Sequence, residues 1–134
     1  MIRKCTEKDF ETMYSIINDA SAAYKGVIPK DRWKEPYMTR DELGREIDEG
    51  VEFWGYESDA ELAGVMGLQQ VQDVTLIRHA YVRSEKRNQG IGGRLLSFLL
   101  EKIMTPVLVG TWSDANWAVK FYEKFAFRKV SMEE

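Results

Sequence analysis

Arg87-Asn88-Gln89-Gly90-Ile91-Gly92-Gly93-Arg94 is the stretch that decides the fold of this 134-residue chain. The segment before it, 75–82, is apolar and β-branched and predicts a strand. After it, apolar residues recur at helical spacing and predict an amphipathic helix. These residues are Ile91, Leu95, Leu96, Phe98, Leu99, Leu100 and Ile103. The sequence therefore predicts a strand, a short basic loop and a helix in direct succession.

The predicted loop has the chemistry of an anion site. Glycines let the backbone approach a ligand without a Cβ in the way. The first N–H groups of a helix lack partners within it and lie at the positive end of its dipole. Basic side chains surround the loop, namely Arg83, Lys86, Arg87 and Arg94. We predict that a small anion binds here, while simple turn punctuation remains the alternative explanation for the glycines.

Two other phosphate-binding loops do not fit the stretch. The glycine order differs from G-x-G-x-x-G, and no acidic residue ends a clear second strand about 20 residues later. A Walker loop requires Gly-Lys-Ser/Thr, which does not follow here. The local chemistry therefore favours neither a dinucleotide fold nor a P-loop enzyme.

Two motifs resemble those of the GNAT superfamily of N-acetyltransferases. Arg87-x-x-Gly90-x-Gly92 resembles the family's R/Q-x-x-G-x-G/A signature for acyl-coenzyme A. The stretch from Trp117 to Phe127 resembles its A-x-x-F-Y-x-K-x-G-F helix. The resemblance covers the chain from about Thr6 to its end. It implies acetyl-CoA as cosubstrate and transfer of the acetyl group to a small-molecule primary amine by direct attack on the thioester.

The order of the predicted elements agrees with this resemblance. Strands are predicted at 1–5, 51–57, 62–71, 75–82 and 107–112, and two helices begin at capping boxes, 6–9 and 39–42. Gly64 and Gly67 indicate a bulge or a close backbone approach in the strand 62–71. We predict one α/β (α+β mixed) domain, 1–134, with a mostly antiparallel mixed sheet, helices on both faces and a splayed parallel strand pair.

The resemblance also implies which residues hold the coenzyme. The pantetheine arm would join an open strand edge as an added strand does, and loop N–H groups would bind the pyrophosphate. The expected coenzyme contacts are Tyr81, Val82, Arg83, Arg87, Asn88, Gln89, Gly90, Gly92, Gly93, Arg94, Asn116, Phe121 and Tyr122. No metal is expected.

Tyr122 and His79 are the expected catalytic residues. Tyr122 matches the family's tyrosine general acid, and its ordinary pKa of about 10 compares with about 8.5 for a thiol. His79 is the only histidine, and an ordinary pKa near 6.5 suits a base at neutral pH. For both, simple packing is the structural alternative, and water relayed to bulk is an equal candidate for the base.

Other conspicuous side chains have structural explanations. Trp54 and Trp112 are candidates for an acceptor pocket, although burial is the commoner fate of tryptophan. The carboxylates Glu57, Glu61 and Asp73 are expected to be solvated turn residues. Cys5 is the single cysteine, which excludes an intramolecular disulfide, and we expect a buried strand residue in a cytoplasmic protein.

Charge and hydropathy exclude several other classes. The net charge of -3 argues against nucleic acid as the main partner. No apolar run is long enough to span a bilayer and no signal peptide is evident, so no membrane association is expected.

Three positions depart from the family pattern. Ala126 replaces a glycine after the tyrosine helix, and Ala115 stands where an asparagine is common, with Asn116 one place later. The chain ends at Glu134, which leaves little room for a last strand and suggests a homodimer through an exposed or exchanged edge. Alternative functions are a non-catalytic acyl-CoA-binding module or partner subunit, and a protein N-acetyltransferase.

Overall fold

The computed structural model describes residues 1–28, 30–110, 116–125 and 127, and it confirms the mixed α/β class. Its sheet has the strand order β1-β2-β3-β4-β5, in which the first four strands are antiparallel and β5 joins β4 in parallel. The strands are β1 Ile2–Lys4, β2 Glu52–Ser58, β3 Glu61–Val71, β4 Val74–Val82 and β5 Val107–Val109. The α-helices are α1 Phe10–Ala20, α2 Arg40–Asp48, α3 Ile91–Lys102 and α4 Asn116–Glu123.

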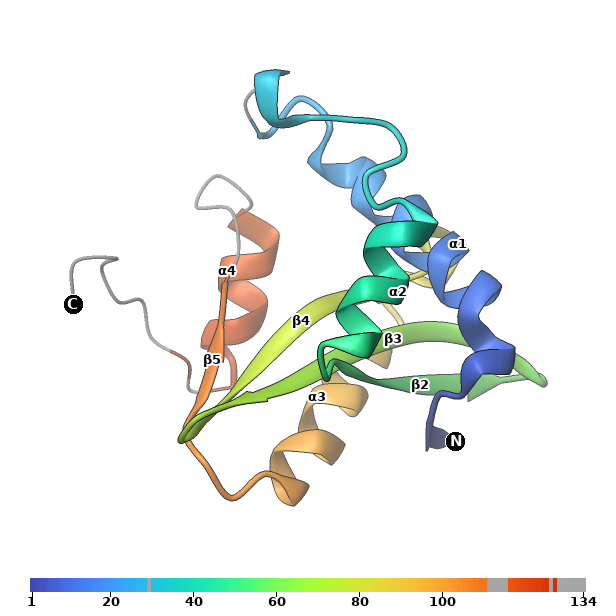
Figure 1. The fold of residues 1–134 in the computed structure, drawn as a ribbon. Helices are drawn as coiled ribbons and strands as arrows, with labels where there is room; N and C mark the ends of the chain where they lie inside the picture. The colour runs from blue at the N-terminus through green and yellow to red at the C-terminus, as the bar shows by residue number, and fades with distance from the viewer. Residues whose placement is uncertain (29, 111–115, 126, 128–134) are drawn as a thin grey trace.

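Helices cover both faces of this sheet (Figure 1). Helices α1 and α2 bury Ile16, Ile17 and Leu43 against one face. Helix α3 buries Leu95 and Leu99 against the other, and α4 joins that second cluster. The predicted placement of helices on both faces is therefore confirmed.

The two predicted capping boxes start the N-terminal helices. The Asp9 carboxylate accepts from the Thr6 N–H at 2.8 Å, ahead of a short 3₁₀ turn, η1 (Glu7–Asp9), that leads into α1. At α2, the Thr39 hydroxyl accepts from the Glu42 N–H at 3.1 Å, and the Glu42 carboxylate accepts from the Thr39 N–H at 3.0 Å. Donors that the first turn leaves without internal partners are satisfied in this way.

A β-bulge interrupts the pairing of β3 and β4, where the two glycines indicated an irregularity. Val65 pairs with Tyr81 but Gly67 pairs with Arg78, so two residues of β4 lie opposite Met66 alone. A Cβ on Gly67 would lie 2.8 Å from the Arg78 carbonyl oxygen, so the close approach also requires glycine there.

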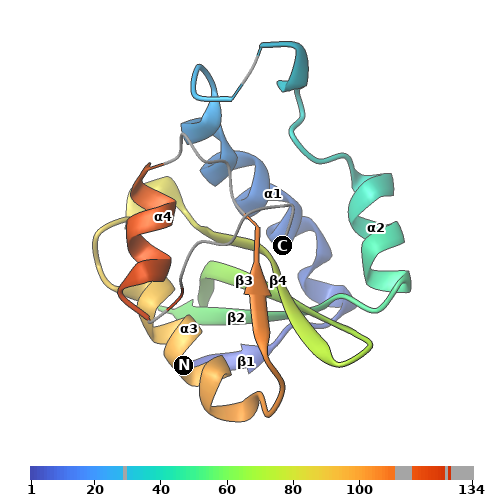
Figure 2. The same ribbon diagram turned by 90° about the vertical axis from the view of Figure 1, so that its left-hand side faces the viewer.

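The parallel pair β4 and β5 separates after a short contact. Pairing joins Thr75–Ile77 of β4 to Val107–Val109 of β5, and the two strands then diverge (Figures 1 and 2). Strand β5 is shorter than the predicted 107–112, and Thr111 and Trp112 lie outside the described residues.

The structure does not test the predictions for the last part of the chain. Ala115, Ala126 and residues 128–134 lie outside the described residues, and the predicted exposed or exchanged final strand falls there as well. Within the described residues, no helix has the length and hydropathy needed to cross a bilayer.

Candidate active site

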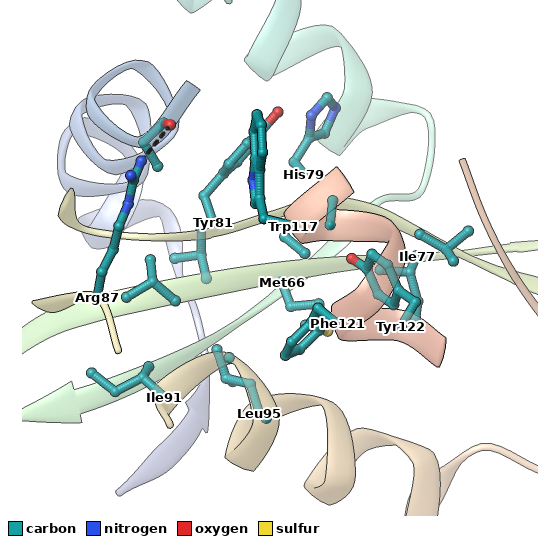
Figure 3. Close-up of a pocket in the computed structure, with 18 of the residues that line it drawn as sticks. Met66, Ile77, His79, Tyr81, Arg87, Ile91, Leu95, Trp117, Phe121 and Tyr122 are labelled. Carbon is teal, nitrogen blue, oxygen red and sulfur yellow. Dashed lines mark hydrogen bonds between the residues drawn. The ribbon is translucent and has the colours of Figure 1, made fainter. Parts of the chain in front are cut away.

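A cleft of about 850 Å³ lies where β4 and β5 separate (Figure 3). Its walls come from β3, β4, the end of β5, the loop before α3, helix α3, helix α4 and the segment after α1. The predicted site residues among those that line it are His79, Tyr81, Val82, Arg87, Asn88, Gly90, Gly92, Gly93, Phe121 and Tyr122. The fold thus brings both motifs and the only histidine to one cavity.

The loop before α3 has the backbone geometry of an anion cradle. Gly90 precedes the first residue of α3 with φ +78°, and Asn88 has φ +63°. A Cβ built on Gly90 would meet nothing within 4 Å, so space is open beside the first N–H groups of the helix. Those N–H groups have no partners within the helix and carry its positive dipole end. A diphosphate fits this part of the cleft.

Gly92 and Gly93 also serve the packing of α3 against α4. A Cβ on Gly92 would lie 3.5 Å from the Phe121 ring, and one on Gly93 would lie 3.3 Å from the Phe125 ring. Small residues therefore let the second motif approach the first. A branched side chain at Gly92 would displace Phe121 as well as crowd the cleft, so such a change does not test ligand placement alone.

The basic side chains around the loop divide into two groups. Lys86 and Arg87 line the cleft, and the Arg87 guanidinium donates to the Ala20 carbonyl at 3.3 Å. Arg83 and Arg94 are outside the lining: Arg83 Nε donates to the Leu62 carbonyl at 3.0 Å, and Arg94 donates to the Tyr56 hydroxyl at 2.9 Å. Of these four basic residues, Lys86 and Arg87 are thus the two that line the cleft, and Lys120 and Lys124 line it from the α4 side.

The backbone of β4 offers an open edge next to this loop. The Arg83 N–H donates to the Ala63 carbonyl at 2.8 Å, so the Arg83 main chain faces β3. Backbone groups of successive strand residues point to opposite sides, so those of Val82 face the β5 side. Because β5 pairs with β4 only as far as Ile77, Val82 lies beyond that pairing and its main chain faces the cleft.

Two further predicted contacts are placed less fully. Gln89 is exposed in the loop and is not part of the lining. Asn116 is the first residue of α4, and its side chain lies outside what the structure describes.

Tyr122 is buried at the base of the cleft. Its ring packs edge-on against Phe121 with the centroids 5.0 Å apart. Burial, with a smaller contribution from Tyr24, raises the pKa of the Tyr122 phenol above its ordinary value. The hydroxyl therefore keeps its proton throughout the physiological range.

His79 lies on the bulge of β4 and faces helix α2. Its Nε2 is 2.6 Å from Oε1 of Glu46, and its ring stacks between Phe53 and Tyr81 at centroid distances of 6.2 and 6.5 Å. Sequence reasoning missed Glu46. The available signal was its position three residues after the buried Leu43, on the face of α2 that points to the core.

Aromatic rings form the wall on the α1 side of the cleft. Tyr24 lies 5.6 Å from Trp117 and 6.4 Å from Tyr81, measured between ring centroids. Burial raises the pKa of Tyr81, with further contributions from Tyr37 and Tyr24. Trp117 belongs to the second motif, whose helical spacing does not indicate that this ring faces the cleft.

Of two other conspicuous side chains, one differs from its expectation. Trp54 packs on Phe98 in the α3 cluster at 6.0 Å, which agrees with the packing alternative and not with an acceptor pocket. Glu57 is not a solvated turn residue, because it lies on β2 and accepts from Arg3 Nε at 3.1 Å.

Cys5 borders a second hollow of about 520 Å³, between the start of α1 and β2. The expectation of a buried strand residue is not met, because Cys5 lies just after the end of β1 and is only half-buried. Burial raises the pKa of the Cys5 thiol to about 11, which makes it a poor nucleophile. Among the described residues, no three metal-ligating side chains are grouped.

Comparisons with known proteins identify the family of this chain. A sequence profile described as an acetyltransferase (GNAT) domain matches residues 3–134. Comparison with the curated proteins gives no match.

Several solved structures have the same fold, and two of the three described next hold coenzyme A or acetyl-CoA. The PaiA N-acetyltransferase from Thermoplasma acidophilum in complex with coenzyme A has a TM-score of 0.76 at 22% identity, covering 93% of this chain and 87% of that one. A GNAT family acetyltransferase from Elizabethkingia anophelis with acetyl-CoA bound has a TM-score of 0.73 at 20% identity, covering 98% and 77%. The ribosomal-protein-S18-alanine N-acetyltransferase from Escherichia coli has a TM-score of 0.79 at 20% identity, covering 98% and 79%. This chain belongs to the GNAT family of acetyltransferases and is an acyltransferase of that type.

Proposed function

We propose that this protein transfers an acetyl group from acetyl-CoA to the primary amine of a small molecule. The observation that carries the proposal is the one cleft that is lined by the glycine loop before α3, by the open edge of β4, by Tyr122 and by His79. Two similar structures hold coenzyme A or acetyl-CoA, which supports the choice of cosubstrate.

The residues of the cleft have separable roles. Backbone N–H groups of the loop, with Lys86 and Arg87, bind the diphosphate, and the open edge at Val82 holds the pantetheine arm. A backbone N–H of the same edge stabilises negative charge on the thioester oxygen as the amine attacks. His79 takes a proton from the arriving ammonium, because only the neutral amine has a lone pair.

Tyr122 supplies the proton that the departing thiolate needs. The ordinary pKa of a phenol is already above that of a free thiol, and burial raises the pKa of Tyr122 further. The phenol therefore donates a hydrogen bond to the thiolate more readily than it gives up a proton outright. The proton is transferred only if the phenol receives another from the nitrogen as the amide forms. The expected contribution to the rate is therefore moderate.

A second candidate for the acceptor is the amino group of a protein, and the names of two structures with the same fold support it. The Escherichia coli and Brucella melitensis proteins of the same fold are named ribosomal-protein-alanine N-acetyltransferases. At 20% and 19% identity, this likeness concerns the fold, so the small amine stays the first proposal.

Release of free coenzyme A thiol tests the proposal and separates the acceptors. The protein is incubated with acetyl-CoA and, in separate reactions, with aliphatic monoamines, aromatic monoamines, polyamines and peptides that begin with alanine. Acetylated product, identified by mass, is expected with a small amine. Product only with the peptides would replace the first acceptor class by the second. Tight coenzyme binding without product from any acceptor would contradict both.

A further inference from the structure

We infer that Glu46 is a positioning residue, which holds His79 as the base for the acceptor amine through the 2.6 Å contact between its carboxylate and the imidazole Nε2. This inference rests on the proposed acetyl transfer. The two residues are 33 positions apart in the chain, and their side chains are only 20% and 16% exposed, respectively. Helix α2 therefore supplies a carboxylate to His79, which itself lines the cleft (Figure 3).

The bulge in β4 is what turns His79 toward this carboxylate. In an uninterrupted strand, residues two apart share a face, so His79 would share the α3 side with Ile77. The extra residue changes the alternation, and Arg78 and His79 both face α2. Both contact Glu46, with Arg78 Nε at 3.6 Å from the same oxygen.

The backbone of His79 is strained in this arrangement. Its φ is +56°, a region that residues other than glycine adopt infrequently and at a cost. Bulges of this type usually have glycine at such a position. The chain instead keeps its one histidine there, with its ring held between Phe53 and Tyr81.

The contact with Glu46 selects the tautomer of the ring. An ionised carboxylate only accepts hydrogen bonds, so Nε2 must carry the hydrogen. Nδ1 is then the nitrogen with a lone pair, and within the described residues no hydrogen bond to it is recorded. The carboxylate also stabilises the imidazolium once Nδ1 has taken a proton, as in other carboxylate–histidine pairs.

The proton balance of the reaction is complete with these groups. Nδ1 of His79 takes one proton from the ammonium, and the free lone pair forms the N–C bond to the thioester carbonyl carbon. The C–S bond breaks, and the thiolate receives, through Tyr122, the second proton that the nitrogen loses. His79 returns its proton to water. Ammonium and thioester thus give amide, thiol and one released proton.

Other charged or titratable groups near the ring are few among the described residues. Helix α2 contributes Glu46, β4 contributes Arg78 and Tyr81, and β2 contributes the uncharged Phe53. Across the cleft lie Tyr122 of α4 and Tyr24 of the 3₁₀ turn η2 (Ser21–Tyr24). Glu46 is therefore the carboxylate in this part of the structure whose removal should alter the orientation and tautomer of the His79 ring.

The test compares steady-state kinetics across pH for the full chain and its variants. Glu46→Gln keeps the size of the side chain but removes the charge, and it can present an amide N–H that favours the wrong tautomer. We expect kcat to fall by about 10- to 100-fold. Protonation of the base gives the kcat/KM profile an acidic limb. The Kd for coenzyme A should not change.

Three further variants keep the result interpretable. Glu49→Gln removes an exposed carboxylate one helical turn further on and should match the wild type. Glu46→Asp should recover part of the lost kcat. His79→Gln should abolish the acidic limb altogether.

The inference is overturned if Glu46→Gln keeps the wild-type kcat. It is also overturned if His79→Gln retains the acidic limb, because the base is then another group. In both cases acetyl transfer by the wild type would stand. Failure of the wild type to acetylate any acceptor would instead remove the proposed function, and this inference with it.

Discussion

Burial decides what Tyr122 can contribute. Desolvation raises its pKa, so the phenol stays protonated, while the packed rings of Phe121 and Phe127 fix its position. A residue of this kind can aim a hydrogen bond at a leaving thiolate even though it is a weaker acid than the thiol. Its role in turnover should therefore be separable from any role in coenzyme binding.

Tyr122→Phe should lower kcat by about 10- to 100-fold, toward the low end of the effects of general acids, because the hydrogen bond to the thiolate is lost. The Kd for coenzyme A, measured by calorimetry, should stay within error, because the rings that line the cleft are retained. Tyr14→Phe is the matched control, since it removes a phenol from α1 outside the cleft. Equal kcat values for the wild type and Tyr122→Phe would exclude the acid role.

Contacts between individual side chains were the least predictable feature of the structure from sequence. His79 and Tyr122 were expected near one ligand, and both line the cleft. The partner of His79 was not predicted, because the bulge that turns the ring toward Glu46 depends on the pairing of β3 with β4. A period of two along the strand places His79 on the opposite face.

At the scale of elements, the loop before α3 is anchored to the end of α1. The Asp19 carboxylate accepts from the Ser84 N–H at 2.7 Å and from the Ser84 hydroxyl at 2.9 Å. Arg87 adds its contact with the Ala20 carbonyl. The loop conformation is thus held by α1 as well as by the strand and helix that it connects, and a cradle fixed before binding has less ordering to do when the ligand arrives.

Asp19→Ala should weaken coenzyme A binding by about 3- to 10-fold, because about 1 kcal/mol of hydrogen bonding that orders the loop is lost. Glu85→Ala is the matched control, since it removes an exposed carboxylate from the same loop without touching that anchor. Simple electrostatics predicts tighter binding of an anion in both variants. Tighter binding after Asp19→Ala would therefore contradict the anchoring role.

Elements whose signals are local were predicted well. Both capping boxes lie within four residues, and both form as expected. The close approach of Gly67 to the Arg78 carbonyl likewise has a local sequence signal, namely a glycine inside a strand pattern. The Asp19–Ser84 contact joins residues 65 apart and has no such signal.

At the scale of the whole molecule, the N-terminal strand is tied to the sheet and to the first helix by one arginine. Arg3 donates to Asp9 at 2.9 Å and to Glu57 at 3.1 Å. The guanidinium lowers the pKa of Asp9 to about 2, with help from the Thr6 N–H. This folded-state value lies below the ordinary one of about 3.9. The pair therefore stabilises the fold above about pH 4, and that stability is lost as the pH falls toward 2.

Asp9→Asn should lower the free energy of unfolding at pH 7 by about 1 to 2 kcal/mol, measured by urea denaturation. The difference from the wild type should shrink between pH 4 and pH 2 as the native carboxylate is protonated. Glu52→Gln breaks the exposed pair with Lys4 and should cost no more than about 0.5 kcal/mol at any pH. An Asp9→Asn deficit that persisted unchanged at pH 2 would refute the role of the charge.

The overall architecture followed from the order of elements. A meander, a helix and a further strand require a mixed sheet with one parallel pair, which the structure has. What the order could not supply is the contact of α2 with β4, because helix packing depends on side chains from distant segments. The contact of Glu46 with His79 and the aromatic wall of Tyr24 and Trp117 are accordingly where sequence reasoning was weakest.

The most direct test of the central claim is a titration of ¹⁵N-labelled protein with coenzyme A, followed through the backbone amides. Binding in the cleft predicts the largest shifts at the amides of residues 88–93 and at Val82, because the diphosphate lies against the loop and the pantetheine arm along the open edge. Residues around the second hollow, such as Cys5 and Val51, should shift little. Shifts concentrated at that hollow, or no shifts at saturating coenzyme, would contradict the account.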